Sequence, residues 1–197
     1  MKKNILVLTG SPRKGGNSDL MADSFIEGAI KSGHKVTKYE TATKHIEGCR
    51  ACDTCFSKGM ACSFQDDFNE LTPLLEKTDL IVFATPLYWY TFPTQIKAVI
   101  DKLYSFIVGQ KPLKIKECML LVCGEEKDEK KFDGIIKSYE LIAINRGWND
   151  IGKLIVPGVI DKGDIKNLYD NYMRQMQTLI QQKAIKAPGE KKPFLNG

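Results

Sequence analysis

Hydrophobic residues fall into five short continuous runs, and each run is followed by a segment with helical spacing. The runs are Ile5–Thr9, Val36–Tyr39, Leu80–Thr85, Met119–Cys123 and Leu154–Val156. A continuous apolar run, in contrast to an alternating one, is typical of a strand buried on both faces. The pattern therefore predicts five strands, of which the second is the weakest.

The intervening segments place apolar residues three and four positions apart, as an amphipathic helix does. The first expected helix is capped by Asn17 or Ser18 and closed by Gly33, and the second covers about 67–77, where Pro73 should kink or restart it. Further helices are expected after Pro93, from Phe132 to Gly147, and from Ile165 to Ile180. Alternation of strand and helix predicts an α/β doubly wound five-stranded parallel sheet with helices on both faces. Ligands of such sheets bind beyond the carboxyl ends of the strands, so the loops after strands one, three and four are the ones to inspect.

Composition agrees with one globular domain: 197 residues, 43% hydrophobic and 27% charged. No apolar stretch is long enough for a membrane helix, and the run after Lys2 and Lys3 is too short for a signal peptide, so we expect a cytoplasmic protein without a membrane partner. The net charge of +5 is scattered along the chain, which argues against a nucleic-acid partner. Six cysteines in a cytoplasmic chain are expected to be reduced thiols, metal ligands or redox groups.

The loop after the first strand has the chemistry of a phosphate site. It reads Gly-Ser-Pro-Arg-Lys-Gly-Gly-Asn-Ser over residues 10–18 and leads directly into a helix. Amides at a helix start attract anions, and hydroxyl, amide and guanidinium groups add donors. The candidate phosphate ligands are Ser11, Arg13, Gly16, Asn17 and Ser18. Neither the Walker A motif nor the G-x-G-x-x-G fingerprint is present, and a plain strand–helix turn is the alternative.

The loop after the third strand carries an unusual run of aromatic residues. Pro86, Leu87, Tyr88, Trp89 and Tyr90 stand in it, and Gly124 follows the fourth strand at the same sheet edge. An exposed aromatic run has no structural purpose, whereas a flat ligand stacked on it would explain it. The alternative is that one or two of the rings pack in the core or at a subunit contact, and Phe92 is the first candidate for that.

A phosphate cradle beside a flat-ring platform describes flavin mononucleotide (FMN). These two loops, together with Lys97, Asp101 and Lys102, resemble the NADPH-dependent FMN reductase branch of the flavodoxin-like superfamily over residues 1 to about 160. The resemblance implies non-covalent FMN, with Ser11, Arg13, Asn17 and Ser18 on the phosphate. Residues 86–90 and Gly124 would lie around the isoalloxazine. It also implies NAD(P)H as co-substrate, no catalytic side chain, and a homodimer or homotetramer that reduces a small-molecule or protein acceptor.

Four cysteines form the sharpest local motif, Cys49-x2-Cys52-x2-Cys55-x6-Cys62. Four thiolates suit a [4Fe–4S] cluster, and the segment resembles the compact motif of the iron–sulfur flavoproteins. A zinc site, a redox-active thiol loop and an unloaded loop are the alternatives. Cys118 and Cys123 are expected in the core, and Asp66 and Asp67 are expected to be ordinary helix-start carboxylates.

These expectations divide the chain into a flavodoxin-like FMN-binding domain at 1–182, with a cysteine-rich insertion at 41–66, and a basic tail at 183–197. The expected function is NAD(P)H-dependent reduction of a flavin or quinone through bound FMN. The rival is a non-enzymatic electron carrier, an iron–sulfur flavoprotein with a [4Fe–4S] cluster on the cysteine loop.

Overall fold

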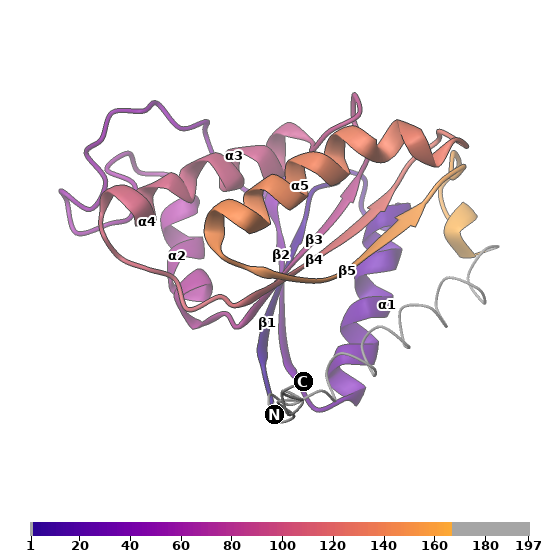
Figure 1. Cartoon of the computed structure of the whole chain (residues 1–197), viewed down its shortest axis with the longest axis horizontal. Coiled ribbons are helices and arrows are strands. Elements are labelled where there is room, and N and C mark those ends of the chain that lie inside the picture. Colours follow the sequence, from indigo (N-terminus) through magenta and orange to yellow (C-terminus); the bar gives the residue numbers. More distant parts are fainter. Residues whose placement is uncertain (1, 167–197) are drawn as a thin grey trace, which may run out of the picture.

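The five predicted strands form one parallel sheet in a computed structural model that describes residues 2–166 (Figure 1). The strand order is β2-β1-β3-β4-β5, and all four pairings are parallel. The strands are β1 (Asn4–Thr9), β2 (Lys35–Glu40), β3 (Leu80–Pro86), β4 (Glu117–Cys123) and β5 (Asn149–Val156). Because the chain moves from β1 to one neighbour and returns to the other, the loops after β1 and β3 flank the point where ligands bind in such sheets.

Helices cover both faces of the sheet. One face packs against α1 (Asn17–Lys31), which contributes Met21, Ala22, Phe25 and Ala29 to the core. The opposite face packs against α2 (Phe68–Lys77), α3 (Thr94–Lys102), α4 (Tyr104–Val108) and α5 (Asp133–Arg146). Three 3-10 turns complete the description: η1 (Thr41–Thr43), η2 (Glu129–Phe132) and η3 (Asp164–Lys166). Among the described residues, no helix is long and apolar enough to cross a membrane.

Several local expectations were wrong. α2 continues through Pro73, because the exposed proline lies opposite Phe68, Leu71 and Leu75, whose burial holds the helix together. The short helix α4 was not predicted from the spacing of hydrophobic residues. Ile165 and Lys166 lie in the 3-10 turn η3. The rest of the last expected helix, the boundary at 182 and the tail at 183–197 lie outside the described residues.

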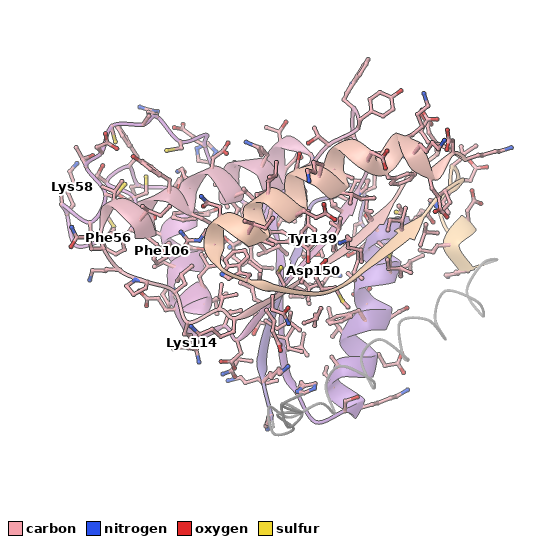
Figure 2. The ribbon with its side chains drawn as sticks, viewed as in Figure 1. Phe56, Lys58, Phe106, Lys114, Tyr139 and Asp150 are labelled. Atoms are coloured by element: carbon pink, nitrogen blue, oxygen red, sulfur yellow. The ribbon has the colours of Figure 1, made fainter. Side chains whose placement is uncertain are left out.

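A polar network is buried between α5 and the start of β4 and β5 (Figure 2). The Tyr139 hydroxyl donates to Asp150 Oδ1 at 2.8 Å and lies 3.2 Å from Cys118 Sγ. Burial would raise the pKa of Asp150, but hydrogen bonds from Lys153, Tyr139 and the Gly152 amide outweigh it and hold that pKa below its usual value. Cys118 is fully buried and is a core residue, as predicted. Its burial raises the pKa of the thiol to about 11.

The cysteine segment between η1 and α2 has no regular structure and lies beside α4 (Figure 1). Its anchor is Phe56, which packs edge-on against Phe106 with ring centroids 5.9 Å apart (Figure 2). Gly109 permits this contact, since a Cβ there would stand 2.2 Å from Phe56 Cδ2. The cysteine segment is therefore attached to the helical layer through a specific ring contact.

Candidate functional site

The loop after β1 leads into α1, whose start has no side-chain cap among the described residues. The helix begins at Asn17, with Gly16 as its N-cap and without any side-chain capping bond. The prediction that Asn17 or Ser18 caps the helix was therefore wrong. A helix start with no side-chain acceptor leaves its first N–H groups free for an anion. Gly16 is required in this tight turn, because a Cβ would stand 2.9 Å from the Arg13 carbonyl oxygen.

Two side chains hold the loop in this shape. Asp19 accepts a hydrogen bond from the Gly15 amide at 2.8 Å and pairs with Lys38. Burial raises the pKa of Asp19, but the bonds from Lys38 and Gly15 lower it by more. Asn17 donates to the Asp161 carbonyl and accepts from the Gly163 amide, so its side chain holds the loop after β5. One N–H of its side-chain amide is thus engaged with Asp161, and the expected place of Asn17 on the phosphate stays a prediction.

The aromatic run after β3 forms a tight turn between Tyr88 and Thr91. The amide of each of these residues bonds the carbonyl of the other, and the two central residues, Trp89 and Tyr90, have φ angles of 45° and 63°. A residue other than glycine in this left-handed conformation costs about 1–3 kcal/mol, and such residues cluster at functional sites. Trp89 is 92% exposed, while Phe92 is buried in the core, as predicted.

The start of α5 lies directly against this turn. Tyr90 O lies so close to Gly134 that a Cβ at that position would stand 2.6 Å away. Lys131 places its ammonium 6.0 Å from the centre of the Tyr90 ring, and Glu126 lies 3.4 Å from the Tyr90 hydroxyl. The position of the aromatic turn thus depends on the backbone at the start of α5.

All eleven residues proposed for cofactor binding line one cavity of about 560 Å³ at the carboxyl edge of the sheet. They are Ser11, Arg13, Gly16, Asn17, Ser18, Pro86, Leu87, Tyr88, Trp89, Tyr90 and Gly124. The cavity also contains residues that the sequence analysis did not identify: Cys123, Glu125, Glu126, Val159 and Ile160. Val159 and Ile160 follow β5, whose carboxyl end reaches the same edge of the sheet. Their position after a predicted parallel strand could therefore have placed them at the cavity. Burial raises the pKa of Cys123 to about 12.

The four clustered cysteines line a second, small cavity of about 20 Å³. Cys49 and Cys52 are exposed, whereas Cys55 and Cys62 are half-buried. A hydrogen bond with Thr54 lowers the pKa of Cys52, while burial and the neighbouring thiols raise the pKa of Cys55. Within residues 2–166, no three cysteine, histidine or acidic side chains converge closely enough to hold a metal ion. The four residues supply the donor chemistry of a metal–thiolate site and line the same cavity.

A buried ion pair lies beneath the same cavity. Lys102 pairs with Asp66, and the two side chains are 4% and 3% exposed. Asp66 also accepts bonds from the Glu47 and Phe68 amides, and Asp67 accepts one from the His45 amide. The expectation of ordinary helix-start carboxylates was therefore incomplete: Asp66 does accept the Phe68 amide, yet it also joins the cysteine segment to α3 through Lys102.

Comparison with known proteins places the chain in a family. The family model described as NADPH-dependent FMN reductase matches residues 3–129. The chain belongs to this family. As a member, it is an FMN-dependent oxidoreductase with NAD(P)H as its electron donor.

Two curated relatives of this FMN reductase family member are named iron–sulfur flavoprotein. The one from Archaeoglobus fulgidus is 29% identical over 165 residues, which cover 81% of this chain and 72% of the relative. The one from Methanosarcina thermophila is 28% identical over 109 residues, 55% of this chain and 56% of the relative. Among solved structures, the NAD(P)H:quinone oxidoreductase from Methanothermobacter marburgensis matches 95% of this chain and 100% of its own, with a TM-score of 0.73 and 18% identity. That likeness shows the flavodoxin-like fold.

Proposed function

We propose that the cavity at the carboxyl edge of the sheet binds FMN, and that the protein uses it to pass electrons from NAD(P)H to a small quinone or a free flavin. One observation carries the assignment: the uncapped start of α1 and the exposed aromatic turn line the same cavity. The volume of about 560 Å³ lies within the range of roughly 300–1,000 Å³ that small-molecule sites occupy.

At the phosphate end, the chain offers amides and one cation. The amides at the start of α1 face the anion and are assisted by the positive end of the helix dipole. Arg13 is exposed and lines the cavity, so its guanidinium is available for a charge-assisted bond. Asn17 contributes its backbone amide, since its side chain is bound to the loop after β5.

At the ring end, the aromatic turn and the loop after β4 form the two walls. When bound, FMN supplies the hydride and electron transfer itself. The protein binds the ring, orients it on Tyr88, Trp89 and Tyr90, and leaves one side of the cavity accessible to the two substrates. Cys123 stays a neutral thiol at neutral pH because burial raises its pKa to about 12, so we assign no acid, base or nucleophile.

The test compares FMN with riboflavin, which lacks the phosphate. Arg13→Ala should weaken FMN binding roughly tenfold to a hundredfold, the range for losing one bond to a charged group, and should leave riboflavin binding unchanged. Lys14→Ala is the matched control, because Lys14 is the adjacent cation and does not line the cavity. NAD(P)H oxidation with a quinone is the activity readout. A colourless protein that takes up no FMN in excess would refute the proposal.

A second candidate function is that of an electron carrier with an iron–sulfur cluster on the cysteine loop. The observation that favours it is the single cavity shared by Cys49, Cys52, Cys55 and Cys62. When bound, a cluster supplies one-electron transfer, and the chain supplies four thiolates and the buried groups around them. Anaerobic purification with iron, sulfide and zinc analysis decides the case. About four irons per chain would support the cluster, and flavin without iron would remove it.

We also propose a homo-oligomer in the cytoplasm. The exposed large hydrophobic residues include Tyr104 and Ile107 on α4 and Leu141 and Ile144 on α5, all on the same layer of helices. Light scattering on the purified protein tests this, and a monomer at micromolar concentration would contradict it.

A further inference from the structure

One hydroxyl in the wall of the cysteine cavity has no partner. Ser105 lies in α4 and is only 3% exposed, and its Oγ makes no hydrogen bond among the described residues. Buried hydroxyls in native proteins are nearly always satisfied, so an orphan indicates a missing group such as a ligand. Of the described side chains, only one other, Arg146, has a buried atom in the same condition, and Arg146 does not line this cavity.

The surroundings of Ser105 show what kind of group is missing. The cavity that it lines contains all four clustered cysteines and the side chain of Lys102. Other polar side chains of its lining are already engaged: Lys102 with Asp66, Ser63 with Thr54, and Arg50 with Glu47. A hydroxyl hydrogen left free beside four thiols matches the acceptor that a thiolate sulfur provides.

We propose that Ser105 is a positioning residue for an iron–sulfur cluster held by the cysteines of this cavity, and that its hydroxyl donates a hydrogen bond to a sulfur of that cluster. The proposal rests on the second candidate function, the iron–sulfur cluster. Hydrogen bonds to cluster sulfurs stabilise the reduced, more negatively charged state and so help to set the reduction potential. Ser105 thereby raises the potential without being a ligand.

Lys102 also lines this cavity, but its substitution would affect more than the reduction potential. Its charge is balanced by Asp66, so the pair adds little net charge, and its removal would leave a buried carboxylate without a counter-ion. A Lys102 variant would therefore mix a change of potential with a loss of stability. Ser105→Ala removes only a hydroxyl that has no partner among the described residues, which makes it the cleaner variant.

The experiment is a redox titration, followed by visible and electron paramagnetic resonance spectra, of the full chain reconstituted anaerobically with iron and sulfide. Ser105→Ala should keep the iron content of the wild type and shift the cluster potential downward. Ser105→Thr, which retains the hydroxyl, should return the potential toward the wild-type value. Ser57→Ala is the control, because Ser57 lies in the same segment, outside the cavity, and its hydroxyl donates to the Thr54 carbonyl.

The possible outcomes distinguish the presence of the cluster from the role of Ser105. A wild-type protein that takes up FMN but no iron, or only zinc, overturns the cluster and this proposal together while leaving the flavin site intact. A loaded cluster whose potential is the same in wild type and Ser105→Ala overturns the role of Ser105 alone. A downward shift of the same size in Ser57→Ala would also overturn it, because the effect would then belong to the segment in general.

Discussion

Gly134→Ala tests whether the start of α5 positions the aromatic turn. The new Cβ would stand 2.6 Å from Tyr90 O, and real Cβ atoms essentially never approach closer than 3.0 Å, so the turn must retreat by at least about 0.4 Å. Alanine is also favoured over glycine within a helix by up to about 1 kcal/mol. The two effects act on different quantities: the overlap moves Trp89 and Tyr90, while the helix preference acts on stability.

We therefore expect weaker FMN binding without a loss of stability. Losing the optimal stacking of one ring costs about 0.5–1.5 kcal/mol, so the FMN dissociation constant should rise roughly twofold to tenfold. Fluorescence titration of the apoprotein measures this constant, and thermal unfolding of the same apoprotein measures stability. Gly48→Ala is the control, since a Cβ there meets no atom within 4 Å. If Gly134→Ala lowered the melting temperature and left FMN binding unchanged, the turn would not depend on α5 in the way described.

Three further predictions concern stability. Asp150→Asn should lower the free energy of unfolding at pH 7 by about 1–3 kcal/mol. Because the pKa of Asp150 is lowered in the folded state, its stabilisation is present above the pKa of the unfolded state and is lost as the pH falls below about 5. The free energies of unfolding from urea titrations at pH 7 and pH 3 should therefore differ less in the variant than in the wild type. Lys102→Met should cost about 3–5 kcal/mol, and adding Asp66→Asn should recover part of it, which a double-mutant cycle by urea unfolding measures; additive losses would refute the coupling. Gly109→Ala should displace Phe56, whose ring would otherwise lie 2.2 Å from the new Cβ, and so speed limited proteolysis of the cysteine segment; an unchanged cleavage rate would show that this contact does not anchor it.

The sheet and the cofactor cavity could be predicted from the sequence because both depend on short-range patterns. Continuous apolar runs identified all five strands, and the loops after β1, β3 and β4 met at one edge because parallel strands end on the same side. Residues 10–18 and 86–90 needed no knowledge of the rest of the chain beyond this rule.

The rest depended on contacts between distant segments, which no local pattern records. Asn17 has the residue type of a helix cap, yet it bonds Asp161, which is 144 residues away in the sequence. The pairing of Asp66 with Lys102 joins an irregular segment to a helix after an intervening strand. The left-handed turn at Trp89 was equally hidden, because its residue types give no hint of positive φ.

The buried pair of Asp66 and Lys102 also bears on whether the cysteine segment could be removed from this chain. A relative that lost the cysteine segment in one deletion would keep Lys102 in its core with no carboxylate to balance it. The stability of the cysteine segment and that of the helical layer therefore depend on each other, and a shortened variant should keep its stability only if Lys102 is replaced as well.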